Sequence, residues 1–359
     1  MNKRVLVGMS GGVDSSVAAA LLKEAGCEVI GMTMCFNIAH RAGKRPSCCG
    51  LQGIEDAKIV AAKLGIKHYV LNFAKELDEK IIKNFCDEYL KGHTPNPCVR
   101  CNQYLKFDIL LKKALSLDCD YLATGHYARI VNDNNGFLLS KAKDEHKDQS
   151  YFLYRLKSKK LKHILFPLGN FCKLEVRDLA RKYKLGVSEK PGSQEICFIP
   201  DDNYRNFLLG RLKDKIKPGD IVDKKGNILG RHKGICLYTI GQRQGLGIAR
   251  GYPIYVTNID AKHNRIVVGK KEEAYSKKLI VKNASWVSSI SRPVNKRIEL
   301  SVKIRYNHKE APAALERLQS NRVKLIFKKP QFAVTPGQSA VFYDKDTVIG
   351  GGIIEKVVA

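Results

Sequence analysis

A Ser-Gly-Gly-x-Asp-Ser sequence at the end of the first apolar run constrains this chain more than any other feature. Residues 4–9 form a continuous apolar run, which is typical of a buried parallel strand. Residues 15–25 carry apolar side chains at helical spacing and end near Gly26, a residue that commonly terminates helices. A buried strand joined to a helix by adjacent glycines predicts the first unit of an α/β fold.

The loop between these two segments has the chemistry of a phosphate-binding site. Adjacent glycines let the backbone turn with its N–H groups inward, where a side chain would obstruct an anion. The helix N-terminus adds partial positive charge, and Ser10 and Ser15 add hydroxyl donors. The loop is neither a Walker A sequence nor Gly-x-Gly-x-x-Gly. A turn that only packs a helix on a sheet is the alternative, and the two serines and Asp14 favour phosphate binding.

The alternation of strand and helix continues through the first 200 residues. The further segments lie at residues 28–35, 54–64, 68–73, 75–90, 104–117 and 121–130. This order predicts an α/β fold with a doubly wound parallel sheet. Later segments are short, alternate in polarity and are separated by Pro-Gly and Lys-Gly-Asn turns, which predicts a small central β-rich module and a C-terminal β-barrel. We therefore expect domains at residues 1–202, 203–277 and 278–359.

The charge of the chain points to a polyanionic partner. Its 359 residues include 63 Lys+Arg and 35 Asp+Glu, a formal net charge of +28. Nucleic acid fits this charge better than a membrane surface, because no basic amphipathic segment stands out; a face of solvated lysines is the alternative. No run approaches the ~18 apolar residues of a membrane-spanning helix, and no secretory signal is evident, so we expect a cytoplasmic protein without a membrane partner.

Cysteines mark a second candidate site. Because cytoplasmic thiols are mostly reduced, a Cys-x-x-Cys pair indicates redox, metal or sulfur chemistry. Cys98 and Cys101 follow a Pro-Asn-Pro loop near a predicted helix N-terminus and beside Arg100, a setting that lowers the pKa of a thiol. Cys197 precedes Phe198 and Ile199. From these residues alone a reactive thiol, a zinc ligand and a buried core cysteine all remain open, and Cys48-Cys49 has no assigned role.

Taken together, these residues resemble a known family. The Ser-Gly-Gly-x-Asp-Ser loop is similar to the pyrophosphate loop of the N-type ATP pyrophosphatases, which have an adenine nucleotide α-hydrolase-like fold. Seven further segments, in family order, are similar to the tRNA 2-thiouridylases of the MnmA type. They lie at residues 94–102, 123–129, 147–153, 196–199, 241–247, 305–306 and 335–343.

The resemblance implies a tRNA-uridine 2-sulfurtransferase. In this family ATP with Mg²⁺ adenylates the C2 oxygen of the anticodon wobble uridine, and a persulfide sulfur then displaces AMP. The resemblance makes Cys101 the first catalytic cysteine and Cys197 the persulfide carrier. It also implies two kinds of partner: the tRNAs for Lys, Glu and Gln, and an upstream persulfide sulfur carrier or cysteine desulfurase.

The family's ligand contacts transfer onto matching positions of this chain. The ATP contacts implied in this way are Gly8, Met9, Ser10, Gly11, Gly12, Val13, Asp14, Ser15, Met34 and Gly125. The implied tRNA contacts are Asn96, Pro97, Cys98, His126, Lys147, Asp148, Gln149, Arg305, Tyr306 and Gln338. The first three of these tRNA contacts would border the target base, which must leave the anticodon stack to react.

One position departs from the family. Cys98 occurs where the best-known members have an aspartate that is assigned general acid/base work, so Cys98 becomes a third catalytic candidate. Cys98, Cys101 and Cys197 together can ligate a 4Fe-4S cluster with one open iron. The persulfide route is the main hypothesis and the cluster route its variant; no metal site is assigned with certainty.

Three other functions are compatible with parts of the sequence. Another enzyme of the pyrophosphate-loop class can adenylate a small molecule or modify a different tRNA base. An RNA-binding module with a degenerate nucleotide site would keep the basic surface without needing the loop and the cysteines intact. The spread of matching segments favours the 2-thiouridylases over all three.

Overall fold

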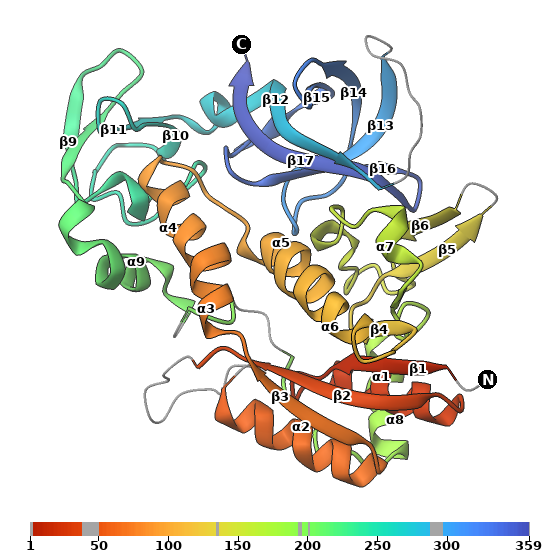
Figure 1. Ribbon diagram of the computed structural model, residues 1–359. Coiled ribbons are helices and arrows are strands. Elements are labelled where there is room, and N and C mark those ends of the chain that lie inside the picture. The colour runs from red at the N-terminus through yellow and green to blue at the C-terminus, as the bar shows by residue number, and fades with distance from the viewer. Residues whose placement is uncertain are drawn as a thin grey trace.

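The structure is a computed structural model that describes residues 3–37, 50–133, 136–192, 196–199, 202–287 and 297–358. Within them the chain forms three sheets, with a parallel sheet at the N-terminal end and a β-barrel at the C-terminal end (Figure 1). Cys48 and Cys49 lie outside the described residues. The same is true of residues 193–195, directly before Ile196 and Cys197.

The N-terminal sheet is parallel and has the strand order β3-β2-β1-β4-β7. The first strand lies in the middle of the sheet, so its carboxyl end opens between neighbours on both sides. The strands are β1 (Arg4–Gly8), β2 (Glu28–Cys35), β3 (Lys67–Asn72), β4 (Tyr121–Thr124) and β7 (Ile164–Leu165).

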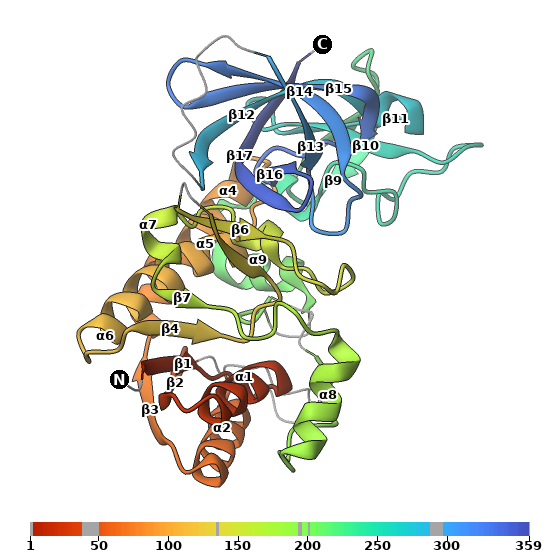
Figure 2. The ribbon, with the colours of Figure 1, turned by 90° about the vertical axis from the view of Figure 1, so that its right-hand side faces the viewer.

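Helices cover both faces of this sheet, as a doubly wound fold requires (Figures 1 and 2). Side chains of a strand alternate between faces: Val5 and Val7 pack with α1 (Val13–Glu24), α2 (Leu51–Leu64) and α8 (Lys173–Lys182). Leu6 points to the other face, where it packs against the helical segment that follows the cysteine loop. The predicted fold class is therefore confirmed.

Two predicted helices are longer and less regular than expected. The segment 75–90 forms α3 (Ala74–Leu77), a π-helical stretch (Asp78–Ile82) and α4 (Lys83–Leu90). The predicted helix 104–117 begins earlier, because α5 (Pro97–Cys101) runs into a π-helical stretch η2 (Asn102–Leu110) and then α6 (Leu111–Leu115). Proline is tolerated at the first position of a helix, so the second proline of the loop starts α5.

The predicted strand 121–130 is wrong as a single element. The chain leaves the parallel sheet after Thr124, because Gly125 approaches the first turn of α1 so closely that an ideal Cβ would lie 2.7 Å from the Ser15 nitrogen. It then forms a hairpin of β5 (Arg129–Asp133) and β6 (Gly136–Ser140), and Ser140 pairs with Thr347 in the C-terminal sheet. A short 3₁₀ turn (Ser150–Phe152) and α7 (Ser158–Leu161) follow.

The central module has a sheet of its own with the order β10-β11-β8-β9. It starts with α9 (Tyr204–Leu212) and a 3₁₀ turn (Lys213–Lys215). The strands are β8 (Gly219–Val222), β9 (Ile228–His232), β10 (Tyr255–Asp260) and β11 (Arg265–Gly269), and two further 3₁₀ turns lie at Ile235–Leu237 and Lys271–Ala274.

The C-terminal module is a closed antiparallel barrel, as predicted. Its strands follow the order β12-β15-β14-β13-β16-β17, and pairing of β12 with β17 closes it around an apolar core. The strands are β12 (Tyr275–Trp286), β13 (Ile298–Lys303), β14 (Ala311–Leu318), β15 (Arg322–Phe332), β16 (Ser339–Asp344) and β17 (Thr347–Val358). Across the described ranges, no helix has the length and apolarity needed to cross a membrane.

Candidate active site

The predicted phosphate loop lies between β1 and α1, at the carboxyl end of the central strand. The Ser10 N–H donates to Ser15 Oγ at 3.1 Å, and the Ser15 and Ser16 hydroxyls donate to the Gly12 carbonyl at 3.2 and 2.9 Å. Gly12 is the N-cap of α1 and has no side chain to cap the first helical N–H groups. Backbone donors at a helix N-terminus suit an anionic ligand such as phosphate.

Close backbone packing explains two of the glycines at this loop. Gly11 has φ of +71°, and an ideal Cβ would lie 2.0 Å from the Gly53 carbonyl oxygen on α2. Gly125 lies against the first turn of α1, where a Cβ would contact Asp14 and Ser15. Neither position tolerates a side chain, so strand β4 and helix α2 both press directly on the loop.

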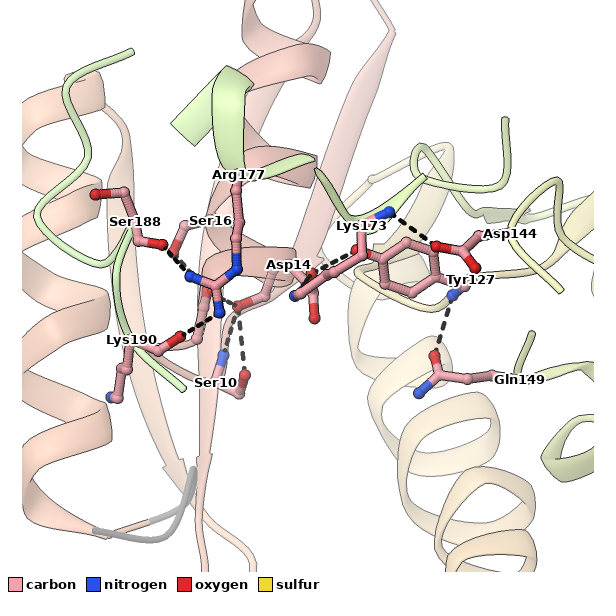
Figure 3. Close-up of polar contacts among 12 residues, drawn as sticks. Ser10, Asp14, Ser16, Tyr127, Asp144, Gln149, Lys173, Arg177, Ser188 and Lys190 are labelled. Carbon is pink, nitrogen blue, oxygen red and sulfur yellow. Dashed lines mark hydrogen bonds and ion pairs between the residues drawn. The ribbon is translucent and has the colours of Figure 1, made fainter. Parts of the chain in front are cut away.

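Three basic residues that the sequence analysis did not single out surround the loop (Figure 3). Lys173 Nζ lies 2.5 Å from Asp14 Oδ1, which also accepts a hydrogen bond of 2.7 Å from the Tyr127 hydroxyl. Lys190 Nζ donates to the Gly11 carbonyl at 3.0 Å and pairs with Asp56. Arg177 donates to the Ser188 and Lys190 carbonyls at 2.7 and 3.2 Å, which holds the segment carrying Lys190.

These contacts concentrate cationic groups around the predicted anion site. Burial, followed by the Asp14 charge, raises the pKa of Tyr127, so this phenol stays a donor to the carboxylate. Lys173 and Arg177 are four residues apart and therefore share one face of α8. This spacing is the one sequence feature that marks Lys173 and Arg177 as candidates. It is a weak indication, because a basic residue on a polar helix usually belongs to a solvated face.

The loop with Cys98 and Cys101 is ordered by a helix cap. Asn96 is the N-cap of α5, and its Oδ1 accepts the Val99 N–H at 3.3 Å. Both thiols are half-buried in the first turns of this helix. The Arg100 guanidinium donates to the Lys80 carbonyl at 3.2 and 3.0 Å and lies 4.9 Å from the Tyr104 ring centre, so it binds the preceding helix.

Cys197 lies on the same apolar cluster as Cys101. Both half-buried cysteines pack against a core that contains Phe85, Leu105 and Phe198, although 96 positions of sequence separate them. In the described part of the chain, neither cysteine forms a disulfide bond. Among the residues that the structure describes, no three His, Cys, Asp or Glu side chains are placed to hold a metal ion, so Cys98, Cys101 and Cys197 do not form a ready ligand set.

His126 is held as a neutral imidazole beside the carboxyl end of β4. Its Nδ1 lies 2.7 Å from Thr124 Oγ1, and Lys106 Nζ lies 3.4 Å from its Nε2. Phe107 and Phe166 flank the ring, with centre-to-centre distances of 5.7 and 5.9 Å. Burial, and then the Lys106 charge, lowers the pKa of His126 well below its usual value. The ring is therefore uncharged at neutral pH, and a nitrogen without a proton can accept a hydrogen bond.

The segment at residues 147–149 is more buried than a solvated turn would be. Asp148 is 5% exposed, and its carboxylate accepts hydrogen bonds from the Ala142 N–H and from the N–H and hydroxyl of Ser150. The Gln149 amide oxygen accepts the Tyr127 N–H at 3.0 Å. The two side chains thus order this turn against Ala142, after β6, and Tyr127, between β4 and β5.

Three residues of the C-terminal barrel that were predicted at the tRNA lie where the modules meet. Arg305 Nη2 donates to the Ile240 carbonyl at 3.1 Å and to the Ala333 carbonyl at 2.7 Å, and burial lowers the pKa of its guanidinium. The Tyr306 ring lies 4.5 Å from the Phe152 ring. Gln338 Nε2 donates to the Thr94 carbonyl at 2.9 Å.

The fold and the loop together define the class of protein. A parallel sheet with a central first strand, and a serine- and glycine-rich loop leading into the first helix, form a pyrophosphate-loop domain; this class uses ATP with Mg²⁺. Family models match the three modules by their descriptions: "tRNA methyl transferase HUP domain" at residues 3–201, "tRNA methyl transferase PRC-barrel domain" at 205–270 and "Aminomethyltransferase beta-barrel domain" at 276–354.

Curated relatives give the family. A "tRNA-specific 2-thiouridylase MnmA" of Halothermothrix orenii is 52% identical, over 98% of this chain and 99% of the relative. One of Clostridium acetobutylicum with the same name is 49% identical, over 99% of this chain and 100% of the relative. The chain therefore belongs to the tRNA-specific 2-thiouridylases of the MnmA type, which confirms the resemblance found in the sequence.

Proposed function

We propose that this chain thiolates the C2 position of the anticodon wobble uridine of tRNA, consuming ATP and releasing AMP and pyrophosphate. The observation that carries the proposal is the pairing of two features in one α/β domain. One is the serine- and glycine-rich loop at the N-terminus of α1, and the other is two distant cysteines, Cys101 and Cys197, on one apolar cluster. Activation by ATP and delivery of sulfur are the two halves of this reaction.

In the first half, the loop holds the triphosphate while the uridine O2 attacks the α-phosphorus and pyrophosphate leaves. The predicted ATP contacts are Gly8–Ser15, Met34 and Gly125. To these we add Lys173 and Lys190, whose ammonium groups lie at Asp14 and at the Gly11 carbonyl. Asp14 is a carboxylate suited to Mg²⁺, which would offset the charge on the departing pyrophosphate when bound.

In the second half, the outer sulfur of a Cys197 persulfide attacks C2, and AMP leaves with the C2 oxygen. The Cys101 thiolate then attacks Cys197 Sγ, which breaks the sulfur–sulfur bond and leaves one sulfur on the base. A Cys101–Cys197 disulfide forms, and a thiol reductant must restore both thiols before the next turnover. The persulfide itself comes from an upstream sulfur-carrier protein or cysteine desulfurase.

Cys98 distinguishes the persulfide route from a cluster route. We assign Cys98 the proton-transfer position at the target base, and we favour the persulfide route because the three cysteines do not form a ready ligand set among the described residues. In a Cys98→Asp variant, persulfide-dependent thiolation should persist. Loss of that activity, together with iron and labile sulfide in anaerobically purified wild-type protein, would favour a 4Fe-4S cluster on Cys98, Cys101 and Cys197.

The tRNA side of the proposal uses the +28 charge and the remaining predicted contacts. Asn96, Pro97 and Cys98 border the everted base, and His126 offers a neutral imidazole near it. The other proposed contacts are Lys147, Asp148, Gln149, Arg305, Tyr306 and Gln338. The substrates we propose are the tRNAs for Lys, Glu and Gln, which would place the reaction in the cytoplasm.

Mass spectrometry of tRNA nucleosides tests the proposal. Purified chain, ATP, Mg²⁺, a persulfide donor and unmodified tRNA should yield 2-thiouridine at the wobble position. Cys197→Ala should abolish this product yet bind tRNA with unchanged affinity. Cys27→Ala, which removes a half-buried thiol directly before β2, should remain active. Thiolation by Cys197→Ala, or a different modified base from the wild type, would refute the assignment.

A further inference from the structure

The loop that precedes Cys98 and Cys101 is hydrogen-bonded at its first residue, Thr94, to both of the other modules. Thr94 opens the Thr-Pro-Asn-Pro sequence, and its N–H donates to the Pro336 carbonyl of the barrel at 2.9 Å. Its own carbonyl accepts the Gln338 Nε2 donor at 2.9 Å. On the third side, Thr94 Oγ1 donates to Thr239 Oγ1 of the central module at 3.3 Å.

The barrel turn that contacts Thr94 is held in place by backbone hydrogen bonds. The turn at residues 335–339 is tied to β17, because Gly337 N–H donates to the Ile354 carbonyl and Ile354 N–H donates to the Gln338 carbonyl, at 2.9 and 2.8 Å. Gly337 has φ of +93°, and an ideal Cβ would lie 2.9 Å from the Thr94 nitrogen. Only glycine allows the barrel to approach the loop this closely.

The position of Thr94 constrains the positions of the two thiols, because the chain between them is short and stiff. Only three residues separate Thr94 from Cys98, and two of them are prolines with fixed φ. Asn96, the third, caps α5, and its side chain lies beside the Tyr151 hydroxyl, which donates to the Ser339 carbonyl of the same barrel turn. A shift of the turn therefore moves the helix that carries Cys98 and Cys101.

We infer that the barrel turn at residues 335–339 positions the catalytic cysteines, with Gln338 as a positioning residue for sulfur transfer. This inference rests on the proposed function and adds to Gln338 a role that does not require contact with tRNA. An amide N–H directed at the Thr94 carbonyl acts before any tRNA is bound. Errors of about 1 Å in the placement of reacting groups lower rates by up to ~100-fold, so a small displacement of the loop is enough to matter.

The test compares Gln338→Ala with Gln319→Ala. The second variant removes the same type of side chain from the exposed turn that joins β14 to β15. With saturating tRNA and persulfidated protein, Gln338→Ala should lower the single-turnover thiolation rate about tenfold beyond any change in the tRNA Kd, with the melting temperature within error of wild type. Gln319→Ala should match the wild type in all three measurements. An inactive wild type would refute the proposed function instead of this inference.

Thiol reactivity without tRNA separates positioning from tRNA contact. Trypsin cleaves after Arg100, so Cys98 and Cys101 fall in different peptides and their iodoacetamide alkylation rates can be measured separately. Gln338→Ala should change at least one of these rates by a factor of two or more in the free protein. Unchanged alkylation combined with a raised tRNA Kd would overturn the inference, because Gln338 would then act through tRNA alone. Gly337→Ala, which forces the turn away from Thr94, should change the alkylation rates further.

Discussion

Asp14 lies between a phenol and an ammonium group, and this arrangement sets the charge at the phosphate loop. Its carboxylate accepts from Tyr127 and pairs with Lys173, which is 15% exposed. Arg177, on α8, and Lys190, in the segment after it, add two further positive charges.

Replacing Lys173 with methionine should raise the KM for ATP about tenfold or more, because a hydrogen bond to a charged group contributes roughly 1.5–3 kcal/mol. The tRNA Kd should not change. Lys182→Met, on the same helix but 67% exposed and paired with Glu24, is the matched control and should leave the KM unaltered. Steady-state pyrophosphate release measures both variants, and equal KM values would remove Lys173 from the ATP site.

Near the end of α4, the helix before the cysteine loop, a carboxylate with a lowered pKa makes the structure sensitive to acid. His93 Nδ1 lies 2.7 Å from Glu88 Oε2 at the end of α4, and this contact, opposed by burial, lowers the pKa of Glu88 to about 2 from 4.5. Gly92, with φ of +74°, packs directly on Ile259 of the central module. The end of α4 therefore fixes where the chain turns toward Thr94.

Because the pKa of Glu88 is lower in the folded state, its contribution to stability is full above about pH 4.5 and is lost as the pH falls toward 2. The free energy of unfolding should therefore decrease less steeply over this window in Glu88→Gln than in the wild type. Glu55→Gln, at an exposed pair on α2, serves as the control. Denaturant titrations at several pH values provide the comparison, and parallel curves for the Glu88 variant and the wild type would contradict the assignment.

Sequence patterns correctly predicted those elements whose local conformational preference agrees with their contacts in the fold. The apolar run of β1 and the glycines after it predicted the strand, the loop and α1. The start of α5 was missed because two prolines suggested a loop, although Asn96 and Pro97 form an ordinary helix start. The break after Thr124 depends on contact between Gly125 and α1, more than 100 residues away, which no local pattern records. The contact between Lys173 and Asp14 was missed for the same reason.

At the scale of the molecule, three modules share one task. The α/β domain carries the predicted ATP loop and the candidate catalytic cysteines, and the other two modules meet at Thr94 and at Arg305. The net charge of +28 extends over all three, with the larger share after residue 200. A large folded polyanion such as tRNA can contact such a surface through its phosphates.

Binding of tRNA should weaken steeply with salt. Neutralising even a few phosphates releases counterions, so we expect the affinity to fall at least about tenfold between 50 and 200 mM monovalent salt. Filter binding or fluorescence anisotropy over this range measures the slope of log K against log salt. An affinity that stays constant across the range would show that the positive charge of the chain does not serve tRNA binding.

The central claim is that ATP activation and the two distant thiols act in one site. The most direct measurement is a single turnover of persulfidated protein with tRNA and ATP, quenched by acid without reductant and analysed by mass spectrometry for nucleosides and peptides. We expect one Cys101–Cys197 disulfide for each 2-thiouridine formed, and neither product without ATP. Thiolated tRNA recovered while Cys101 and Cys197 both remain free thiols would contradict the account.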